Sequence, residues 1–497
     1  MSEGQDEVVR ALQSGAAVGA PGPLRRIETH LSQVFLAPER VYKLKRAVRL
    51  PFVDFSTLAQ RRAACEAETR VNRAFAPGLY LGTEPLTRGP DGAVRLGGEG
   101  EVLDWVVVMR RFPDGALFDE MARDGRLTPS LIGEAAERIA LAHATADPAP
   151  HAGTASGYLE IVQGLRRAEA DGAAVHGLEP GGDDLYAGLE RAIGAASGLI
   201  EARRAEGRVR RGHGDLHLRN ICLFEGVPTP FDALEFDPAL ATADVLYDLA
   251  FLLMDLRRRG LDGLANTAMN RYWDAAGESE PGLALLPAFM ALRAAVRTAV
   301  AMEAGKPGEA REYRCLGLEL LERRPPRLLA IGGLSGSGKS AVARAIAADL
   351  PGVCGARLLR TDVIRKAGRA QGGPLDAAAY VPSRRAEVYR AMAARAAEAL
   401  AAGCPVLADA TFQAPEAPAG IRAAAGDARF DALWLRASKG VRLARVGGRS
   451  GDASDADAVV AAAQAEPGLE PGWRIIDADG PLEAVVAACR DALGLRS

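Results

Sequence analysis

The sequence is poor in lysine, so arginine is the ordinary cation of this chain. Only six of its 61 basic residues are lysines, namely Lys43, Lys45, Lys306, Lys339, Lys366 and Lys439. The ammonium group of lysine is a compact point charge, whereas the guanidinium group of arginine is a planar fork. A lysine kept in such a chain is a candidate for a site that needs a point charge, such as a phosphate-binding site. Chance survival on the surface is the alternative for any single lysine.

Paired cysteines and long apolar runs are also missing. The six cysteines lie far apart with no CxxC pair, so neither a zinc site nor a disulfide framework is indicated, and we expect buried, reduced thiols. The chain has no run of 18 apolar residues, and it opens with acidic and polar residues rather than with a basic and then an apolar segment. We therefore expect a cytoplasmic protein with no membrane contact.

The charge balance favours small partners. A net charge of -3, without a basic cluster rich in aromatic residues, does not predict a nucleic-acid groove, and no protein partner is evident. The composition, with 48% hydrophobic and 25% charged residues, is that of a folded globular protein. A chain of 497 residues is too long for one ordinary core.

A proline pair divides the chain. Residues 322–327 read Glu-Arg-Arg-Pro-Pro-Arg, which ends a helical run and begins a stiff, extended linker, so we place a domain boundary between residues 325 and 326. The first domain is predicted to contain strands at 33–37, 41–45 and 103–109, a helix at 58–75, and long helices up to residue 320. In the second, strands at 328–331, 406–408 and 432–435 alternate with helices, as in a parallel sheet with crossover helices.

A phosphate-binding loop opens the second domain. Residues 333–340 read Gly-Leu-Ser-Gly-Ser-Gly-Lys-Ser, between an apolar strand and a periodic helix. The glycines Gly333, Gly336 and Gly338 would let the loop wrap the phosphates so that backbone N–H groups bind the anion. Lys339 would reach the β- and γ-phosphates, and Ser340 would bind Mg²⁺. A plain glycine turn is the alternative.

Two aspartates at strand ends extend this site. Asp362 follows an apolar run where an acceptor hydroxyl could be deprotonated, and Asp409 closes a strand where it could hold Mg²⁺. Either could instead cap the next helix. Further on, Arg442, Arg445 and Arg449 are spaced to share one helical face, where they could neutralise a migrating phosphoryl group or simply face solvent.

From about residue 327 to 497, these motifs resemble the small-molecule P-loop kinases, the gluconate kinase and polynucleotide kinase group with an AAA-type P-loop domain. The resemblance implies that Asp362 lies beside the acceptor and that the arginines, Arg445 and Arg449 among them, contact ATP. No acceptor-specific motif carries over.

A second constellation lies upstream. His213-Gly-Asp215-Leu-His217-Leu-Arg-Asn220 places Asp215 and Asn220 five residues apart, as in the catalytic loop of protein kinases, and Asp232 follows a strand and a turn. In that arrangement the first aspartate positions and deprotonates the acceptor hydroxyl, while the asparagine and the second aspartate hold Mg²⁺. His213 and His217 are spaced like a metal pair, but no third ligand is evident and structural hydrogen bonding is favoured.

Such a lobe also needs a lysine on its third strand. Lys43 and Lys45 both qualify and share one strand face. The residue two before the functional lysine should lie against adenine, and Val41 suits that contact better than Lys43 does, which favours Lys43. Its partner should be Glu66 or Glu68 of the following helix, and we prefer Glu68.

The upstream motif resembles the aminoglycoside phosphotransferase and choline kinase superfamily over about residues 25 to 300. Two departures are the lack of a glycine-rich loop before Lys43 and an insert at 150–205 that cannot be assigned. The order of the two domains resembles a family labelled bifunctional aminoglycoside phosphotransferase and ATP-binding proteins. It implies a fold of mixed α/β and α+β class, with a protein-kinase-like two-lobed N-terminal domain joined to a C-terminal P-loop parallel-sheet domain.

The leading hypothesis is therefore a bifunctional kinase that uses ATP and Mg²⁺ in two sites, each transferring a γ-phosphoryl group to a small hydroxylated acceptor. If aminoglycosides were acceptors, Asp183 and Asp184 are the acidic pair that could receive such polycations. A nucleotide-binding regulatory protein, in which one domain controls the other, is a second hypothesis. A polynucleotide-end kinase is a third, which the modest charge disfavours.

Overall fold

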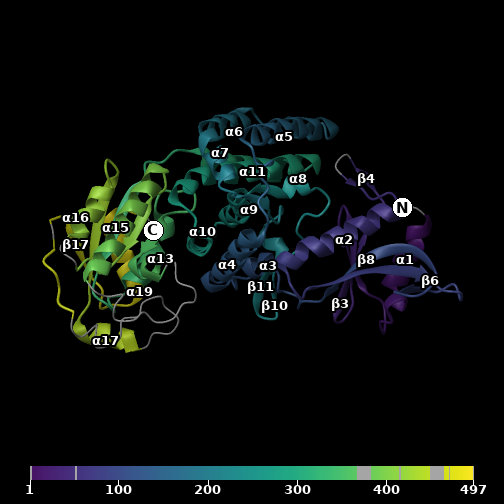
Figure 1. Ribbon diagram of the computed structural model, residues 1–497, viewed down its shortest axis with the longest axis horizontal. Coiled ribbons are helices and arrows are strands. Elements are labelled where there is room, and N and C mark those ends of the chain that lie inside the picture. The colour runs from purple at the N-terminus through teal and green to yellow at the C-terminus, as the bar shows by residue number, and fades with distance from the viewer. Residues whose placement is uncertain are drawn as a thin grey trace. The chain divides into compact units, whose positions relative to one another are not determined.

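The computed structural model describes residues 3–50, 53–366, 382–413, 416–447, 464–469 and 471–495 (Figure 1). The chain divides into two compact units, one formed by residues 1–158 with 200–255 and the other by residues 159–199 with 256–497. The predicted boundary at 325/326 falls inside the second unit, between α12 (Pro307–Leu321) and β13 (Arg327–Gly332). Two separate domains with that boundary stay a prediction.

The first unit is built on a six-stranded antiparallel sheet. Its order is β1 (Arg25–Glu28), β2 (Ser32–Leu36), β3 (Arg40–Lys45), β8 (Glu101–Arg110), β6 (Tyr80–Arg88) and β7 (Val94–Leu96). Because side chains alternate along a strand, Val41, Lys43 and Lys45 of β3 point to one face, and Tyr42 and Leu44 point to the other. Lys43 pairs with Val107 in the middle of the sheet.

Each face of this sheet is covered by a helix. Residues Val8 and Leu12 of α1 (Glu3–Gln13) belong to the same apolar cluster as Phe35 and Leu44. On the other face, α2 (Leu58–Phe75) buries Cys65 in a cluster with the strand residues Val41 and Val107. A capping box formed by Thr57 and Gln60 starts α2, and the helix bounds predicted from the sequence are confirmed.

The rest of the first unit carries the loop from His213 to Asn220. Its helices include α3 (Phe118–Arg123), α4 (Pro129–Thr145), α7 (Ser197–Ala205), α8 (Pro238–Ala241) and α9 (Val245–Arg258), of which α9 runs into the second unit. Its short strands pair as β4 (Arg49–Leu50) with β5 (Val53–Asp54), β9 (Val209–Arg211) with β12 (Thr242–Asp244), and β10 (Ile221–Phe224) with β11 (Val227–Pro230).

The second unit combines helices with a parallel sheet. The helices before the P-loop strand include α5 (Ala155–Val175, which begins in the first unit), α6 (Asp184–Ala195), α10 (Asp262–Ala276), α11 (Leu286–Glu303) and α12. Helix α11, with the 3₁₀ turn before it, is long and apolar enough to cross a membrane, but 72% of its most apolar window is buried inside the protein. That burial is typical of a core helix.

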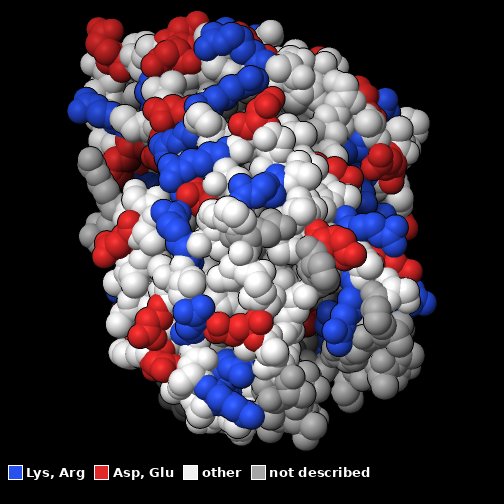
Figure 2. Space-filling model, turned by 90° about the vertical axis from the view of Figure 1, so that its left-hand side faces the viewer, with Lys and Arg blue, Asp and Glu red and all other residues white. Residues whose placement is uncertain are grey.

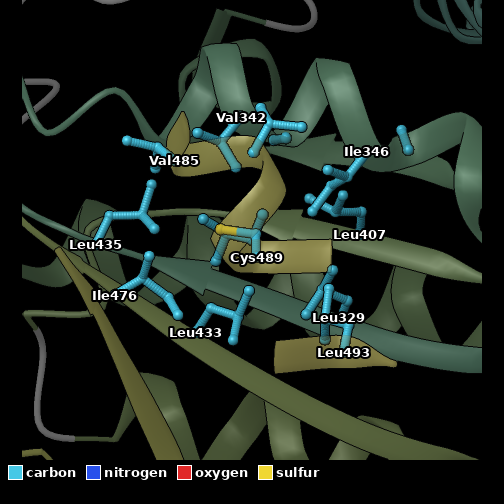
Figure 3. Packing of buried hydrophobic residues seen from close by; sticks show 14 of the residues in the cluster. Leu329, Val342, Ile346, Leu407, Leu433, Leu435, Ile476, Val485, Cys489 and Leu493 are labelled. Carbon is cyan, nitrogen blue, oxygen red and sulfur yellow. The ribbon is translucent and has the colours of Figure 1, made fainter. Parts of the chain in front are cut away.

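The sheet of the second unit has five parallel strands. Its order is β14 (Arg357–Arg360), β15 (Val406–Asp409), β13, β16 (Arg429–Arg436) and β17 (Trp473–Asp477). Helices α13 (Lys339–Ile346) and α19 (Leu482–Leu493) pack side by side over one apolar core, in which Val342 and Val485 meet Leu329 and Leu433 of the sheet (Figure 3). Further α-helices within the described residues of this sheet domain are α14 (Thr361–Lys366), α15 (Pro382–Ala401), α16 (Ala417–Ala424) and α17 (Lys439–Gly447).

The predicted fold class is therefore confirmed. An antiparallel sheet with helices forms the N-terminal part, and the P-loop follows the central strand of a parallel sheet. Because β15 and β16 flank β13, the loops after these three strands meet at one edge of the sheet, where ligands bind in open α/β folds.

Candidate active sites

Both lysines of β3 enter one cluster of charges. Lys43 Nζ lies 2.8 Å from Glu68 Oε1 and 2.5 Å from Asp232 Oδ1. Lys45 Nζ lies 2.5 Å from Glu68 Oε2 and also forms an ion pair with Glu235. The structure thus brings together Lys43, Glu68 and Asp232, as expected, and adds Lys45 and Glu235. Two cations face three carboxylates.

Burial and the neighbouring charges shift the pKa values of the residues in this cluster. Burial alone lowers the pKa of Lys43, but Asp232, Glu68 and Glu235 outweigh it and hold that pKa well above its usual value. Burial alone would raise the pKa of Asp232, yet the charge and hydrogen bond of Lys43 keep it below the usual value. Burial raises the pKa of Glu235, and Lys45 opposes it only in part. Lys43 and Asp232 are therefore both charged at neutral pH.

Asp232 is held in an unusual backbone conformation. Its φ angle is +62°, a left-handed value that costs energy for a residue with a Cβ atom. Its N–H donates to Tyr80 Oη at 3.1 Å, and the next N–H, of Ala233, donates to Asn72 Oδ1 at 2.8 Å. Side chains from β6 and α2 thus fix the turn that aims the Asp232 carboxylate at Lys43.

The loop from His213 to Asn220 is anchored by Asp248 of α9. This buried carboxylate accepts hydrogen bonds from the N–H groups of His213 and Gly214, both at 2.8 Å, and lies 3.0 Å from His143 Nε2. Gly214 has a φ of +82°, and a Cβ there would lie only 3.0 Å from two other side chains, including Leu234, so glycine is required. This role of Asp248 was not predicted from the sequence.

The anchored loop presents Asp215 and Asn220 together. Asn220 Nδ2 donates to Asp215 Oδ2 at 2.9 Å, which leaves the Asn220 carboxamide oxygen for another ligand. The N–H of Phe231 donates to the Asn220 carbonyl at 2.9 Å, so the residue before Asp232 lies against Asn220. The Asp215 side chain is 40% exposed, and His217 Nε2 lies 3.4 Å from it.

His213 has a structural position. It is fully buried, its Nε2 is 2.8 Å from the Phe231 carbonyl oxygen, and burial lowers its pKa. Among the described residues, no group of three or more His, Cys, Asp and Glu side chains could hold a metal ion by itself. A Mg²⁺ ion held by Asn220 and Asp232 would need phosphate oxygens as well, which is the usual mode for this ion with nucleotides.

A cavity of about 480 Å³ is lined by several of these residues. Its apolar lining includes Val34, Leu36, Val41, Met109 and Phe231, and its charged lining includes Lys43, Lys45, Asp215, Asp232 and Glu235. A cavity with both apolar and charged lining fits a purine joined to phosphates. The turn between β1 and β2, Thr29 to Ser32, also lines it, in the place where the sequence shows no glycine-rich loop.

The P-loop of the second unit forms a cradle that side chains would fill. Gly336 has a φ of +85°, and a Cβ there would lie 2.4 Å from the Arg442 carbonyl oxygen. Ser337 Oγ is buried without a hydrogen-bond partner, and Lys339 is only 8% exposed, with no ion-pair partner among the described residues. A buried cation and an orphaned hydroxyl beside such a loop fit a phosphate group.

The predicted acidic residues lie at the same edge of the sheet. Asp409 ends β15 and is 3% exposed; its Oδ2 lies 3.3 Å from Arg360 Nε, and its Oδ1 has no hydrogen-bond partner. That free oxygen fits a metal shell next to Ser340. Asp362 lies in the first turn of α14, and its Oδ1 is 2.9 Å from Arg365 Nη1.

The arginines of α17 hold the P-loop from the other side. Arg442 is buried and its Nη1 donates to the Ser335 carbonyl at 3.4 Å. Arg445 donates to the carbonyls of Ala478 and Gly480, both at 2.8 Å, and lines a second cavity of about 510 Å³ beside the loop. Arg449 lies outside the described residues.

Two further predictions, on an acidic pair and on the cysteines, differ from what the structure shows. Asp183 and Asp184, nominated as an acidic pair for a polycation, are already paired with arginines, Asp183 with Arg166 at 2.8 Å and Asp184 with Arg314. The cysteines are free, but they are not all buried, since Cys315 is exposed and Cys404 is partly exposed.

Comparison with known proteins gives matches that extend along most of the chain. The chain is 32% identical over 486 residues to the uncharacterized protein Rv2004c of Mycobacterium tuberculosis. This match covers 92% of the chain and 93% of the relative. The uncharacterized protein Mb2027c of Mycobacterium bovis matches equally well. A family described as AAA domain matches residues 328–466.

Solved structures match the two parts of the chain separately. A gluconokinase from Sinorhizobium meliloti is 25% identical and covers 35% of this chain and 99% of its own, with a TM-score of 0.25. A choline/ethanolamine kinase family protein from Mesorhizobium loti is 16% identical and covers 64% of this chain and 95% of its own, with a TM-score of 0.37.

Proposed function

The chain belongs to the same family as the uncharacterized mycobacterial proteins, and we propose that it is an ATP-dependent phosphotransferase with two separate nucleotide sites. The observation that carries the proposal is the single cavity in which Lys43, Asp232 and Asp215 meet. A phosphoryl transfer needs little more from a protein than positioning, charge neutralisation and a base. Those three residues provide one group for each task.

In the N-terminal site, Lys43 would bind the phosphates of ATP while Glu68 keeps its ammonium group in place. Asp232 and the Asn220 carboxamide oxygen would hold Mg²⁺, which when bound neutralises charge on the phosphates. Asp215, which faces the same cavity and is partly exposed, would accept the proton of an acceptor hydroxyl. Asp248 would hold the loop in position through its hydrogen bonds with the N–H groups of His213 and Gly214.

In the C-terminal site, the loop Gly333 to Ser340 would hold the phosphates through its N–H groups and Lys339. Ser340 and the free oxygen of Asp409 would hold Mg²⁺. Asp362 would face the acceptor hydroxyl, and Arg445 would contact ATP from the second cavity. The acceptors of both sites are proposed to be small hydroxylated molecules, and the protein is proposed to act in the cytoplasm.

No observation specifically supports either of the two alternative functions, a polynucleotide-end kinase or a regulatory protein. On the face in Figure 2, which shows the left-hand side of Figure 1, arginine and lysine side chains are interspersed with carboxylates, so that face gives no support to a polynucleotide-end kinase. A regulatory protein without turnover would have no chemical need of Asp215, whose carboxylate is nevertheless presented to the cavity.

The test is a screen with labelled ATP against metabolites and aminoglycosides, using the wild type, Asp215→Ala and Lys339→Ala in parallel. We expect at least one phosphorylated product that depends on Asp215 and not on Lys339, and another with the reverse dependence. Acceptor phosphorylation in which no product depends on Asp215 would overturn the N-terminal assignment. Labelling of oligonucleotide 5′ ends would support the end-kinase alternative instead.

A further inference from the structure

A glutamine from outside the P-loop accepts a hydrogen bond from one of the backbone N–H groups of the loop. The N–H of Ser335 donates to Gln464 Oε1 at 2.7 Å. Ser335 is the third residue of the loop and is 4% exposed. N–H groups of such loops are the donors that bind phosphate oxygens. Gln464 therefore satisfies, within the protein, a donor of the kind that a nucleotide uses.

The residues around Gln464 are tied to the strands on both sides of β13. The carbonyl of Ala465 accepts a hydrogen bond from Gln413 Nε2 at 3.1 Å, and Gln413 follows β15. Glu466 Oε1 lies 3.1 Å from Nε of Arg436, the last residue of β16. Since β15 and β16 flank β13, the segment from Gln464 to Glu466 crosses in front of the strand from which the P-loop starts.

The geometry also shows which part of the loop Gln464 faces. Lys339 and Ser340 begin α13, whereas Ser335 lies five residues before Ser340, near the start of the loop. The tether through Gln413 leads to the loop after β15, the strand that ends at Asp409, and Asp362 follows β14, the neighbour of β15. Gln464 thus lies between the P-loop and the side of the sheet that carries the predicted acceptor residue.

We propose that Gln464 is a specificity-determining residue that faces the terminal phosphate of ATP and makes the C-terminal site prefer a triphosphate over a diphosphate. The inference rests on the proposed function of the P-loop. A carboxamide suits this position because it can serve both states of the loop. Without nucleotide, its oxygen accepts the hydrogen bond of the Ser335 N–H. With nucleotide bound, the Ser335 N–H would bind a phosphate oxygen, and the NH₂ group of Gln464 would donate to another. A carboxylate in its place would only accept, and it would repel the terminal phosphate.

The test is hydrogen–deuterium exchange of the full chain, followed in the peptide that carries Gly333 to Ile346, during titration with ATP or ADP in Mg²⁺. This readout is independent of the N-terminal site and of turnover. In Gln464→Glu we expect the apparent affinity for ATP to fall by about tenfold or more, while that for ADP changes by less than about threefold. The ratio of the two affinities is the measured quantity.

Glu466→Gln is the matched control, because it changes a charge two residues away, breaks the exposed pair with Arg436, and leaves Gln464 in place. Its affinity ratio should equal that of the wild type. An unchanged ratio in Gln464→Glu, or an equal change in both variants, overturns the inference while leaving the P-loop function standing. Absence of protection by either nucleotide in the wild type overturns the proposed function of this site itself.

Discussion

At the scale of single residues, the N-terminal site depends on where two lysines stand relative to three carboxylates. Lys43 reaches Asp232 and Glu68, whereas Lys45, at 1% exposure, is shared between Glu68 and Glu235. Lys45 is therefore enclosed by protein carboxylates, and Lys43 stands next to the carboxylate that would bind the metal. This arrangement supports the choice of Lys43 as the phosphate-binding lysine.

Asp215→Ala should lower acceptor phosphorylation by the N-terminal site by about 10²-fold or more, as expected for the loss of a positioned base. The fold should be little affected, since this side chain is 40% exposed. Initial rates with a labelled product, together with the thermal unfolding midpoint, check both statements. Asp124→Ala is the control, an exposed aspartate paired with Arg126, and it should leave the rate unchanged. A wild-type rate in Asp215→Ala would remove the base from the mechanism.

His213 gives the stability a pH dependence. Burial lowers the pKa of this imidazole in the folded state below its unfolded value of about 6.5, so the unfolded chain takes up a proton before the folded chain does. The contribution is fully present above about pH 6.5 and declines as the pH falls toward the folded-state pKa. Urea unfolding between pH 5 and 8 should show the decline in the wild type and a smaller one in His213→Gln. Equal slopes for the two proteins would contradict the account.

Residue roles could be predicted only where a motif supplied them. The spacing from Asp215 to Asn220 and the scarcity of lysine led to Lys43 and Asp232, and the structure brings these residues together. The shared strand face placed Lys45 beside Lys43, but no sequence signal paired it with its second partner, Glu235, which is 190 residues away. Asp248 was hidden for the same reason, as it acts on a loop that starts 35 residues earlier.

At the scale of elements, capping residues and the periodicity of apolar residues predicted a helix where both were present in the sequence. The helix from Leu58 to Phe75 has a capping box at its start and a 3–4 residue spacing of buried positions, and its bounds agree with the prediction. Helices α5, α6 and α7, within the insert that could not be assigned, are held by partners far along the chain, such as Glu169 with Arg314. Such long-range pairs leave no periodic mark in the sequence.

The P-loop should not tolerate a side chain at Gly336. An alanine Cβ would lie 2.4 Å from the Arg442 carbonyl oxygen, and the φ of +85° disfavours any L residue. Gly336→Ala should therefore abolish nucleotide protection of the loop in hydrogen exchange and leave the N-terminal site unchanged. Gly440→Ala in α17 is the control, since nothing lies within 4 Å of its Cβ position and alanine favours a helix. Wild-type protection in Gly336→Ala would mean that the loop does not bind phosphate in this conformation.

At the scale of the whole molecule, the second unit is joined internally by a buried arginine. Arg357 of β14 is fully buried, and its guanidinium lies 2.5 Å from Asp274 and 3.1 Å from Glu280, with Asn270 Oδ1 at 2.9 Å. These partners belong to α10 and to the 3₁₀ turn before α11, both before the predicted domain boundary. Polar groups thus tie the helices to the strand that leads to Asp362, which explains why contacts group them in one unit.

Arg357→Met should lower the free energy of unfolding of this unit by about 3–5 kcal/mol, because it leaves the buried carboxylate of Glu280 with one cation fewer and removes the partner of Asp274. Arg384→Met, which removes an exposed pair with Glu387, should cost less than about 1 kcal/mol. Urea unfolding followed by circular dichroism gives both values. Equal costs for the two variants would show that the buried cluster does not stabilise the unit.

The central claim is that one chain carries two independent ATP sites, and the stoichiometry of ATP binding tests it most directly. Equilibrium dialysis with labelled ATP and Mg²⁺ should give two nucleotides per chain for the wild type. Lys339→Ala and Asp232→Ala should each retain one, and the double variant should retain none. A single nucleotide bound by the wild type, or two still bound by Lys339→Ala, would contradict the account.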